Sequence, residues 1–259
     1  MSLRNKTAIV CGSTQGIGWE TAKLLAQKGA NVVLVARNEE SLKSRVKELH
    51  SDSQKHSYIV ADFNQPNQLK EVLNNWVAQG NVANILVNNT GGPKGGPIIA
   101  AEVDEFLTAF NQHLICNHIL VQTLYKGMIE SGYGRIVNVI STSVKQPLNN
   151  LGVSNTIRGA VANWSKTLAN ELGQYGITVN NVLPGATNTG RLQSIAETKA
   201  SKTGESTAEI FDEMAAESPM KRIAEPIEVA NAIVFLASPE ASYINGINVP
   251  VDGGRTKCL

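Results

Sequence analysis

Short runs rich in valine and isoleucine alternate with longer segments of helical period along the whole chain. The runs lack the strict polar alternation of a half-exposed sheet, so they are typical of strands buried on both faces. Such alternation predicts an α/β fold, a doubly wound sheet of about seven parallel strands with helices on both faces. The expected strands are Thr7–Cys11, Asn31–Val35, Ser57–Ala61, Ile85–Val87, Arg135–Ile140, Thr178–Leu183 and Ile247–Val251.

The segments between these runs predict the helices. Gly29 stands where a helix C-terminal cap is expected, and Pro226 stands in the first turn of the last helix. No linker or repeat divides the chain, so we expect one domain over residues 1–259, with a functional lid at about 186–220, where no clear strand is found. The expected helices are Trp19–Lys28, Glu39–His50, Gln68–Gln79, Asp104–Glu130, Ser154–Gln174 and Pro226–Ser238.

Composition excludes several classes of function. The net charge is +1 and charged residues make up 17%, so we expect no nucleic-acid or membrane partner. The three cysteines, Cys11, Cys116 and Cys258, are far apart, which argues against a disulfide framework or a metal site and favours a reducing cytoplasm. No signal peptide or membrane-spanning run is recognised, so a cytoplasmic location is expected.

A glycine-rich loop joins the first strand to the first helix. Glycines at this place permit a tight turn and let backbone N–H groups approach a pyrophosphate at the helix N-terminus. Because the loop has a strand before it and a helix after it, it predicts a Rossmann-type dinucleotide site rather than a structural turn. The loop reads Gly12-Ser13-Thr14-Gln15-Gly16-Ile17-Gly18.

The end of the second strand favours NADP over NAD. An NAD site places an acidic residue there to accept the ribose hydroxyls. This chain has Ala36 at that position and Arg37 beside it, and a guanidinium is suited to a phosphate. The alternative is that Arg37 is an ordinary solvated residue.

Polar residues follow the third and fourth strands. Asp62 comes after the third strand, and a run from Asn88 to Gly91 ends the fourth. Ligands of open α/β sheets bind at the carboxyl ends of the strands, so these residues belong to the predicted site.

On these motifs the chain resembles the short-chain dehydrogenase/reductase family, and within it the 3-oxoacyl-acyl-carrier-protein reductases. The resemblance implies a seven-stranded sheet, a nicotinamide cofactor, a small-molecule substrate and a homotetramer. It also implies that Asp62 lies by the adenine, Asn88 by the cofactor ribose and Thr189 by the nicotinamide amide. The motifs that carry it are the glycine loop, Asn88-Asn89-Thr90-Gly91, Gly134 to Ser141, Gly176 to Asn180, Pro184-Gly185 and Val251 to Gly254. The full cofactor set expected from loop and resemblance adds Phe63, Thr187 and Arg158 to the residues already named.

Catalysis in this family needs asparagine, serine, tyrosine and lysine. The flanking motifs set Ser141 at the serine position, but Ser154 and Arg158 at those of the tyrosine and lysine. Ser154 is a much weaker acid than tyrosine, and Arg158 stays charged, although it can still bind a ribose hydroxyl. At the asparagine position we read His113, with Asn111 and Asn117 close by. The resemblance therefore implies a degenerate tetrad.

His113 is titratable, so we hypothesise that it delivers the proton, directly or through water and Ser141. The alternative is a packed histidine bonded to backbone. The leading function is an NADPH-dependent oxidoreductase of a small carbonyl compound. Alternatives are an NADP(H)-binding protein without catalysis, such as a redox sensor or scaffold subunit, and a reductase of C=C bonds. No metal site is expected.

Two further features have more than one interpretation. The basic residues of the lid either form a mixed solvated face or meet an acidic carrier or a CoA phosphate. The fourth and fifth helices have more apolar residues than one sheet can cover, which suggests a subunit interface. The basic residues are Arg191, Lys199, Lys202, Lys221 and Arg222, and the apolar ones are Leu114, Ile115, Ile119, Leu120, Leu124, Val161, Trp164 and Leu168.

Overall fold

A parallel sheet with strand order β3-β2-β1-β4-β5-β6-β7 forms the centre of the molecule. The computed structural model describes residues 2–258, so residues 1 and 259, the two ends of the expected domain, lie outside the described range. The predicted parallel α/β fold is confirmed. The strands are β1 Thr7–Cys11, β2 Asn31–Ala36, β3 Ser57–Val60, β4 Ile85–Asn88, β5 Gly134–Val139, β6 Ile177–Pro184 and β7 Asn248–Val251.

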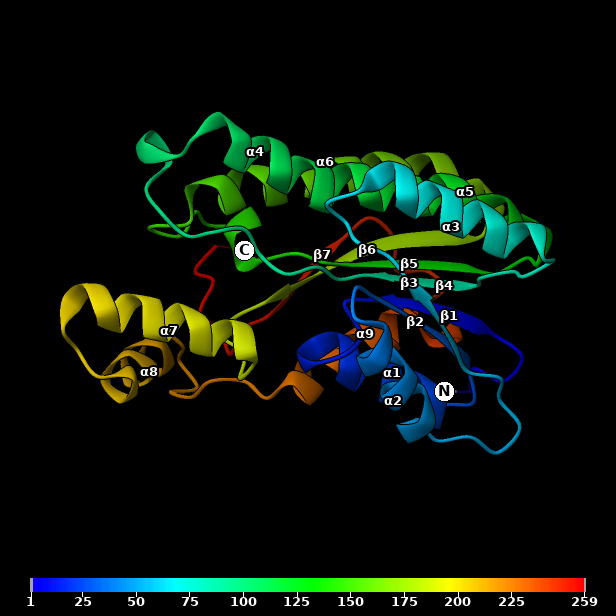
Figure 1. Ribbon diagram of the computed structural model, residues 1–259, viewed down its shortest axis with the longest axis horizontal. Coiled ribbons are helices and arrows are strands. Elements are labelled where there is room, and N and C mark those ends of the chain that lie inside the picture. The colour runs from blue at the N-terminus through cyan, green and yellow to red at the C-terminus, as the bar shows by residue number, and fades with distance from the viewer. Residues whose placement is uncertain (1, 259) are drawn as a thin grey trace.

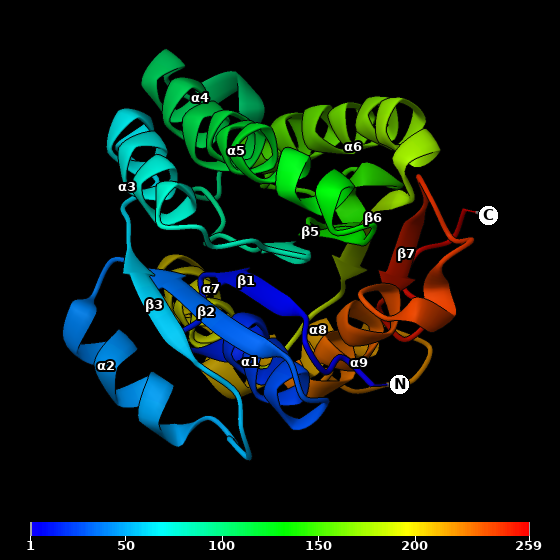
Figure 2. The same ribbon diagram turned by 90° about the vertical axis from the view of Figure 1, so that its right-hand side faces the viewer.

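Helices cover both faces of this sheet. In Figures 1 and 2, α3, α4, α5 and α6 lie on one face, and α1, α2 and α9 lie on the other. The pair α7 and α8 lies beyond one end of the sheet (Figure 1). The bounds are α1 Gly16–Gln27, α2 Glu39–Glu48, α3 Pro66–Ala78, α4 Val103–Phe110, α5 Cys116–Glu130, α6 Gly152–Leu172, α7 Gly190–Thr203, α8 Thr207–Ala216 and α9 Pro226–Leu236.

Burial on both faces explains why the strands are almost continuously apolar. Along β1, Ala8 and Val10 pack into the core on the α1 and α9 side, whereas Ile9 and Cys11 pack into the core on the α3 and α5 side. Successive side chains of a strand point to opposite faces, so each layer takes alternate residues. Each fully buried large aliphatic side chain stabilises the fold by about 1.5–3 kcal/mol.

Apart from shifts of a few residues at the ends of elements, the structure differs from the expected elements in two places. The single helix expected over Asp104–Glu130 is interrupted by a π-helical turn at Asn111–Ile115. The proposed lid contains two helices, α7 and α8, that the sequence analysis did not predict. Side-chain caps begin both: Thr189 accepts a hydrogen bond from the N–H of Leu192, and Ser206 forms a capping box with Glu209.

Many of the apolar residues considered for a subunit interface belong to the core of the chain itself. Leu120, Leu124, Val161 and Leu168 are buried against the sheet, so they contribute no outer surface. The other four are only partly buried. No helix within residues 2–258 combines the length and the apolar character that crossing a membrane requires.

Candidate active site

A cavity of about 660 Å³ lies at the carboxyl ends of the strands. Its walls come from the loops after β1 to β6 and from α6 and α7. The order in which the chain adds strands reverses between β1 and β4, since β2 and β3 lie on one side of β1 and β4 to β7 on the other. Such a switch point is the usual ligand site of open α/β sheets. The predicted residues that line it are Gly12, Thr14, Gln15, Gly16, Ile17, Arg37, Asp62, Phe63, Thr90, Gly91, Ser141, Ser154, Arg158, Pro184, Gly185, Thr187 and Thr189.

The glycine loop forms one wall, at the N-terminus of α1. Gly12 and Gly16 have φ of +57° and +56°, a backbone conformation that favours glycine. The helix N-terminus has no side-chain cap from Gln15 and no acidic residue in its first turn. Its free N–H groups and the bare backbone of the loop therefore fit an anionic group such as the pyrophosphate of a dinucleotide.

Ser13 and Gly18 belong to the loop but do not line the cavity. The Ser13 side chain is fully buried and its hydroxyl donates to the carbonyl of Val35 at 3.4 Å. A Cβ on Gly18 would lie 2.2 Å from the carbonyl oxygen of Gly12. Both residues thus shape the loop from behind the lining of the cavity.

Asn88 also lies outside the cavity lining, contrary to the expected position beside the ribose. Its side chain is 2% exposed, and its Nδ2 donates to Oδ1 of Asn138 at 2.8 Å inside the sheet. The next residue, Asn89, lines the cavity instead, and its amide donates to the carbonyls of Cys11 and Gly12, each at 3.2 Å. Consecutive side chains at a strand end point to opposite sides, which explains the exchange.

Asp62 and Arg37 lie at the end of the cavity formed by the loops after β2 and β3. One Asp62 oxygen accepts hydrogen bonds from the backbone N–H and the side-chain amide of Asn64, at 3.0 and 2.9 Å. Its other oxygen has no hydrogen bond from a described residue. Arg37 is exposed and forms no ion pair with any residue from 2 to 258. Both side chains are therefore free to meet a ligand.

Ser141 follows β5 on the other side of the cavity. Its Oγ accepts a hydrogen bond from the backbone N–H of Ser143 at 3.1 Å, which holds the side chain in place. Because the oxygen accepts that bond, its own O–H remains able to donate to a ligand oxygen.

Ser154 and Arg158 lie one turn apart on α6, so they share a face of the helix. Arg158 is 7% exposed, and its Nη1 donates to the carbonyl of Val139 at 3.0 Å. Burial, and then the positive charge of Arg191, lower the pKa of Arg158 to about 10. The guanidinium is therefore still charged at neutral pH.

His113 lies behind the cavity rather than in its wall. It is 1% exposed, its Nδ1 is hydrogen-bonded to Oγ1 of Thr90 at 2.5 Å, and its Nε2 is buried without a partner among the described residues. Burial, and then the charge of Arg158, lower its pKa to about 2. A histidine that stays neutral offers only a weakly acidic N–H, so the structure speaks against His113 as the proton donor.

Arg191, in the first turn of α7, is exposed and lines the cavity. The sequence placed it among the basic lid residues, either on a solvated face or against an acidic carrier or a CoA phosphate. Its Nη2 donates to the carbonyl of Pro93 at 2.5 Å, and its side chain lies over Gly92. Burial lowers its pKa. Arg191 comes two residues after Thr189, which the resemblance places beside the nicotinamide amide. This closeness in sequence could have identified Arg191 as a residue of the site.

Further residues of the lining were missed because nothing in their local sequence marks them. They come from adjoining loops and from the helix faces that close the cavity. No three His, Cys, Asp or Glu side chains gather as a metal site within residues 2–258. The missed residues are Val35, Asn38, Ala61, Asn64, Gln112, Val139, Ile140, Leu151, Gly190, Leu192 and Ile195.

Residues 12–256 match the family described as enoyl-(acyl carrier protein) reductase. Over 256 residues the chain is 32% identical to the 3-oxoacyl-acyl-carrier-protein reductase of Vibrio cholerae, covering 98% of each chain. An NADPH-dependent reductase of Bacillus subtilis is 27% identical over 259 residues, which is 99% of this chain and 100% of the relative.

Among solved structures, L-sorbose reductase from Gluconobacter frateurii, complexed with NADPH and L-sorbose, is similar with a TM-score of 0.93. Its sequence is 31% identical, and the match covers 100% of this chain and 99% of that one. Family, relatives and fold agree over nearly the whole length. The chain therefore belongs to the short-chain dehydrogenase/reductase family, in the group described as enoyl-(acyl carrier protein) reductase, and is an oxidoreductase that uses a nicotinamide cofactor.

Proposed function

We propose that this protein is an NADPH-dependent reductase that transfers hydride to a small carbonyl compound, in the manner of 3-oxoacyl-thioester reductases. The observation that carries the proposal is one cavity that holds both the uncapped glycine loop and the free hydroxyl of Ser141. The similarity to a 3-oxoacyl-acyl-carrier-protein reductase supports the substrate class.

NADPH is favoured over NADH by the end of β2. Arg37 stands there without an ion pair to any described residue, next to Ala36 where an acid would repel a phosphate. A guanidinium at this place suits the 2′-phosphate of NADPH. The NADPH-dependent reductase of Bacillus subtilis supports the same choice.

In the proposed mechanism the bound nicotinamide supplies the hydride that reaches the carbonyl carbon. Ser141 donates its hydroxyl to the carbonyl oxygen and so holds the group in place. As hydride arrives, negative charge develops on this oxygen, and the hydroxyl of Ser141 and the charge of Arg158 stabilise it.

The catalytic tetrad is degenerate in this proposal, with Ser154 and Arg158 at the tyrosine and lysine positions. Neither group is acidic enough to act as the tyrosine does, so the alkoxide oxygen takes its proton from water. The loss of a positioned acid lowers the rate by about 10²- to 10⁴-fold. A slow reductase is therefore expected.

The test is oxidation of NADPH by the purified protein with 3-oxoacyl thioesters, diketones, quinones and enones, with cofactor binding measured in the same preparation. Turnover of a ketone that falls about 100-fold in Ser141→Ala supports the proposal. Reduction of enones alone indicates C=C chemistry. Tight NADPH binding without turnover of any substrate contradicts the proposal and favours a role in cofactor binding alone.

We also propose that the protein is a homo-oligomer, as the resemblance implies. Large apolar side chains are exposed on and before α4: Ile99 is 95% exposed, Val103 71% and Leu107 56%. An apolar surface of this kind is suited to contact with a second copy. Light scattering of the eluted protein tests this, and a monomer mass contradicts it.

A further inference from the structure

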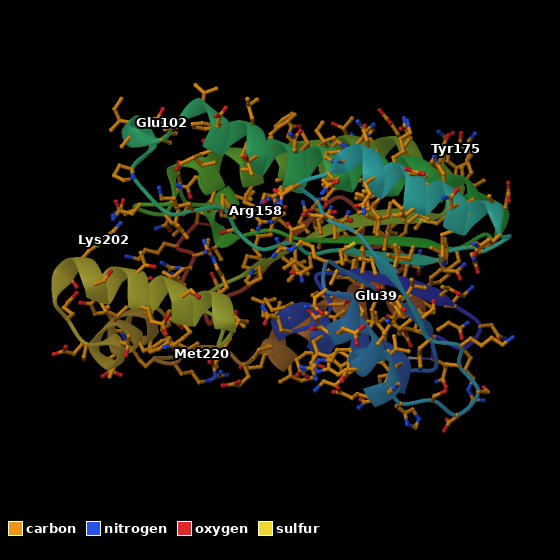
Figure 3. The ribbon with its side chains drawn as sticks, viewed as in Figure 1. Glu39, Glu102, Arg158, Tyr175, Lys202 and Met220 are labelled. Carbon is orange, nitrogen blue, oxygen red and sulfur yellow. The ribbon has the colours of Figure 1, made fainter. Side chains whose placement is uncertain are left out.

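Two arginines from different elements face the same end of the cavity. Arg158 comes from α6 and Arg191 from the first turn of α7, and both line the cavity with Ser141. In Figure 3, Arg158 lies at the end of the sheet from which the α7–α8 pair extends. The charge of Arg191 lowers the pKa of Arg158, so the two cations are close enough to repel each other.

This positive charge has no counter-charge in the described structure. Neither arginine forms an ion pair with an acidic residue from 2 to 258. Asp62 is the only acidic residue among the residues that line the cavity, and it lies by the loop after β3. Arg158 is buried, whereas Arg191 is exposed at the rim. A buried charge in a protein is normally paired, because removing a charge from water is costly. A site built in this way suits an anion.

The donors of both guanidinium groups are largely unused. Within residues 2–258, Arg158 donates one hydrogen bond, to the carbonyl of Val139, and Arg191 donates one, to the carbonyl of Pro93. An arginine has five N–H donors in a planar fork, and this fork matches the oxygens of a carboxylate or phosphate. Each backbone contact fixes the direction of a guanidinium and leaves most of its donors free.

We propose that the substrate is an anionic carbonyl compound whose carboxylate is held between Arg158 and Arg191. This inference rests on the proposed reductase function and narrows its substrate to carbonyl compounds with a free carboxylate, which a simple 3-oxoacyl thioester lacks. Arg158 is anchored to Val139, two residues before Ser141, so the carboxylate lies a few bonds from the carbonyl that Ser141 holds. Short oxo acids have this arrangement of groups.

A cofactor phosphate is a second source of the same negative charge. The uncapped N-terminus of α1 offers a phosphate its own donors, in the wall formed by the glycine loop. We therefore assign the arginine pair to the substrate, and the experiment distinguishes the two sources by measuring cofactor affinity separately.

The experiment compares 3-oxobutanoate with its methyl ester, which differs in the charge but keeps the carbonyl. NADPH oxidation is measured for the wild type, for Arg191→Gln and for the control Lys202→Gln. Lys202 is exposed on the same helix, as Arg191 is, but it lies outside the cavity, so the control removes a charge of the same sign away from the site. Arg191 is the better position to change, because Arg158 is buried against β5 and its removal risks misfolding.

We expect kcat/KM of the wild type to be at least about tenfold higher for the acid than for the ester. Arg191→Gln should raise KM for the acid by about 10- to 100-fold, leave the ester unchanged, and leave the NADPH dissociation constant within about threefold. Lys202→Gln should keep the preference for the acid. Arg158→Lys, which retains a positive charge, should keep part of the preference for the acid over the ester.

Two results overturn the inference: equal kcat/KM for acid and ester, or an Arg191→Gln variant that binds NADPH much more weakly and keeps its preference for the acid. The second result assigns the arginines to a cofactor phosphate. If neither compound is turned over although another carbonyl compound is, the inference is overturned as well. If no carbonyl compound is turned over, the proposed function fails, and calorimetry of 3-oxobutanoate on the NADP⁺ complex decides the inference alone. Binding that Arg191→Gln removes supports an anion site, and the absence of binding overturns it.

Discussion

A hydrogen bond between Oγ1 of Thr90 and Nδ1 of His113 joins the loop after β4 to the π-helical turn Asn111–Ile115. Thr90 lines the cavity, whereas His113 is buried behind it. A π-helical turn adds a residue to a helix and so redirects the side chains around it. Here the turn holds the imidazole of His113 against Thr90, outside the lining of the cavity.

The low pKa of His113 makes the stability of the protein depend on pH. This pKa is about 2 in the folded protein and about 6.5 in the unfolded chain. Between these values the unfolded chain binds a proton that the folded protein does not, so acid favours unfolding. From pH 7 to pH 5 this group should lower the free energy of unfolding by about 2 kcal/mol. Urea unfolding at several pH values measures the loss.

The variant His113→Gln should flatten this dependence, and the exposed-histidine variant His118→Gln should retain it. An unchanged slope in His113→Gln would show that another group causes the acid sensitivity. The same variant also addresses the proton donor. Since a neutral His113 is no acid, turnover at pH 7 should fall less than about tenfold, whereas a loss of 100-fold or more would restore His113 as the proton source.

Gly18→Ala should damage both the fold and the cofactor site. A Cβ at this position would lie 2.2 Å from the carbonyl oxygen of Gly12, and backbone atoms cannot move aside without deforming the loop. We expect a loss of about 1–3 kcal/mol in the free energy of unfolding and weaker binding of NADPH.

The matched control is Gly159→Ala in α6, where a Cβ meets nothing within 4 Å. Alanine is favoured over glycine inside a helix, so this variant should be unchanged or more stable by about 0.5–1 kcal/mol. Thermal unfolding compares the two variants. Equal effects would mean that the close approach of Gly18 to Gly12 is unimportant.

Arg37→Ala should lower the affinity for NADPH and leave that for NADH nearly unchanged. The reason is that only NADPH carries the phosphate that the guanidinium would contact, and such a contact is worth about 10-fold or more in affinity. Fluorescence titration of both cofactors measures the change. Lys47→Ala, an exposed position on α2 outside the cavity, is the charge control. Equal affinities of the wild type for the two cofactors would defeat the phosphate-site interpretation.

In the proposed function, Ser154 and Arg158 stand at the tyrosine and lysine positions of the family, so the double variant Ser154→Tyr with Arg158→Lys would supply those two side chains. If the missing acid limits the rate, this variant should reduce a simple uncharged ketone about 10- to 100-fold faster than the wild type. Steady-state kinetics at saturating NADPH measures the gain. The single variant Ser154→Thr is the control, because it keeps a weak hydroxyl acid. A folded double variant without any gain would place the limiting step elsewhere.

Local sequence was enough to predict the fold. The strand β1 begins and ends where the apolar run Thr7–Cys11 does, because a strand buried on both faces needs that composition. The glycine loop could also be predicted from local sequence. Gly12 and Gly16 have positive φ, a backbone conformation that favours glycine, so the turn itself determines the residue type. Helix boundaries were less accurate, and α7 and α8 were missed because their polar faces resemble a loop.

The amino-acid sequence by itself determined the parallel sheet, the position of the dinucleotide loop and the identity of the residues at the carboxyl ends of the strands. Only the tertiary structure decided that Asn89 rather than Asn88 lines the cavity, that burial lowers the pKa of His113 and that Arg191 lines the same cavity as Arg158. The first kind of property depends on neighbours in the chain. The second kind of property depends on how segments distant in the chain pack together, because that packing decides which side chains are shielded from water and which charges lie near each other. A local sequence pattern contains no information about such packing.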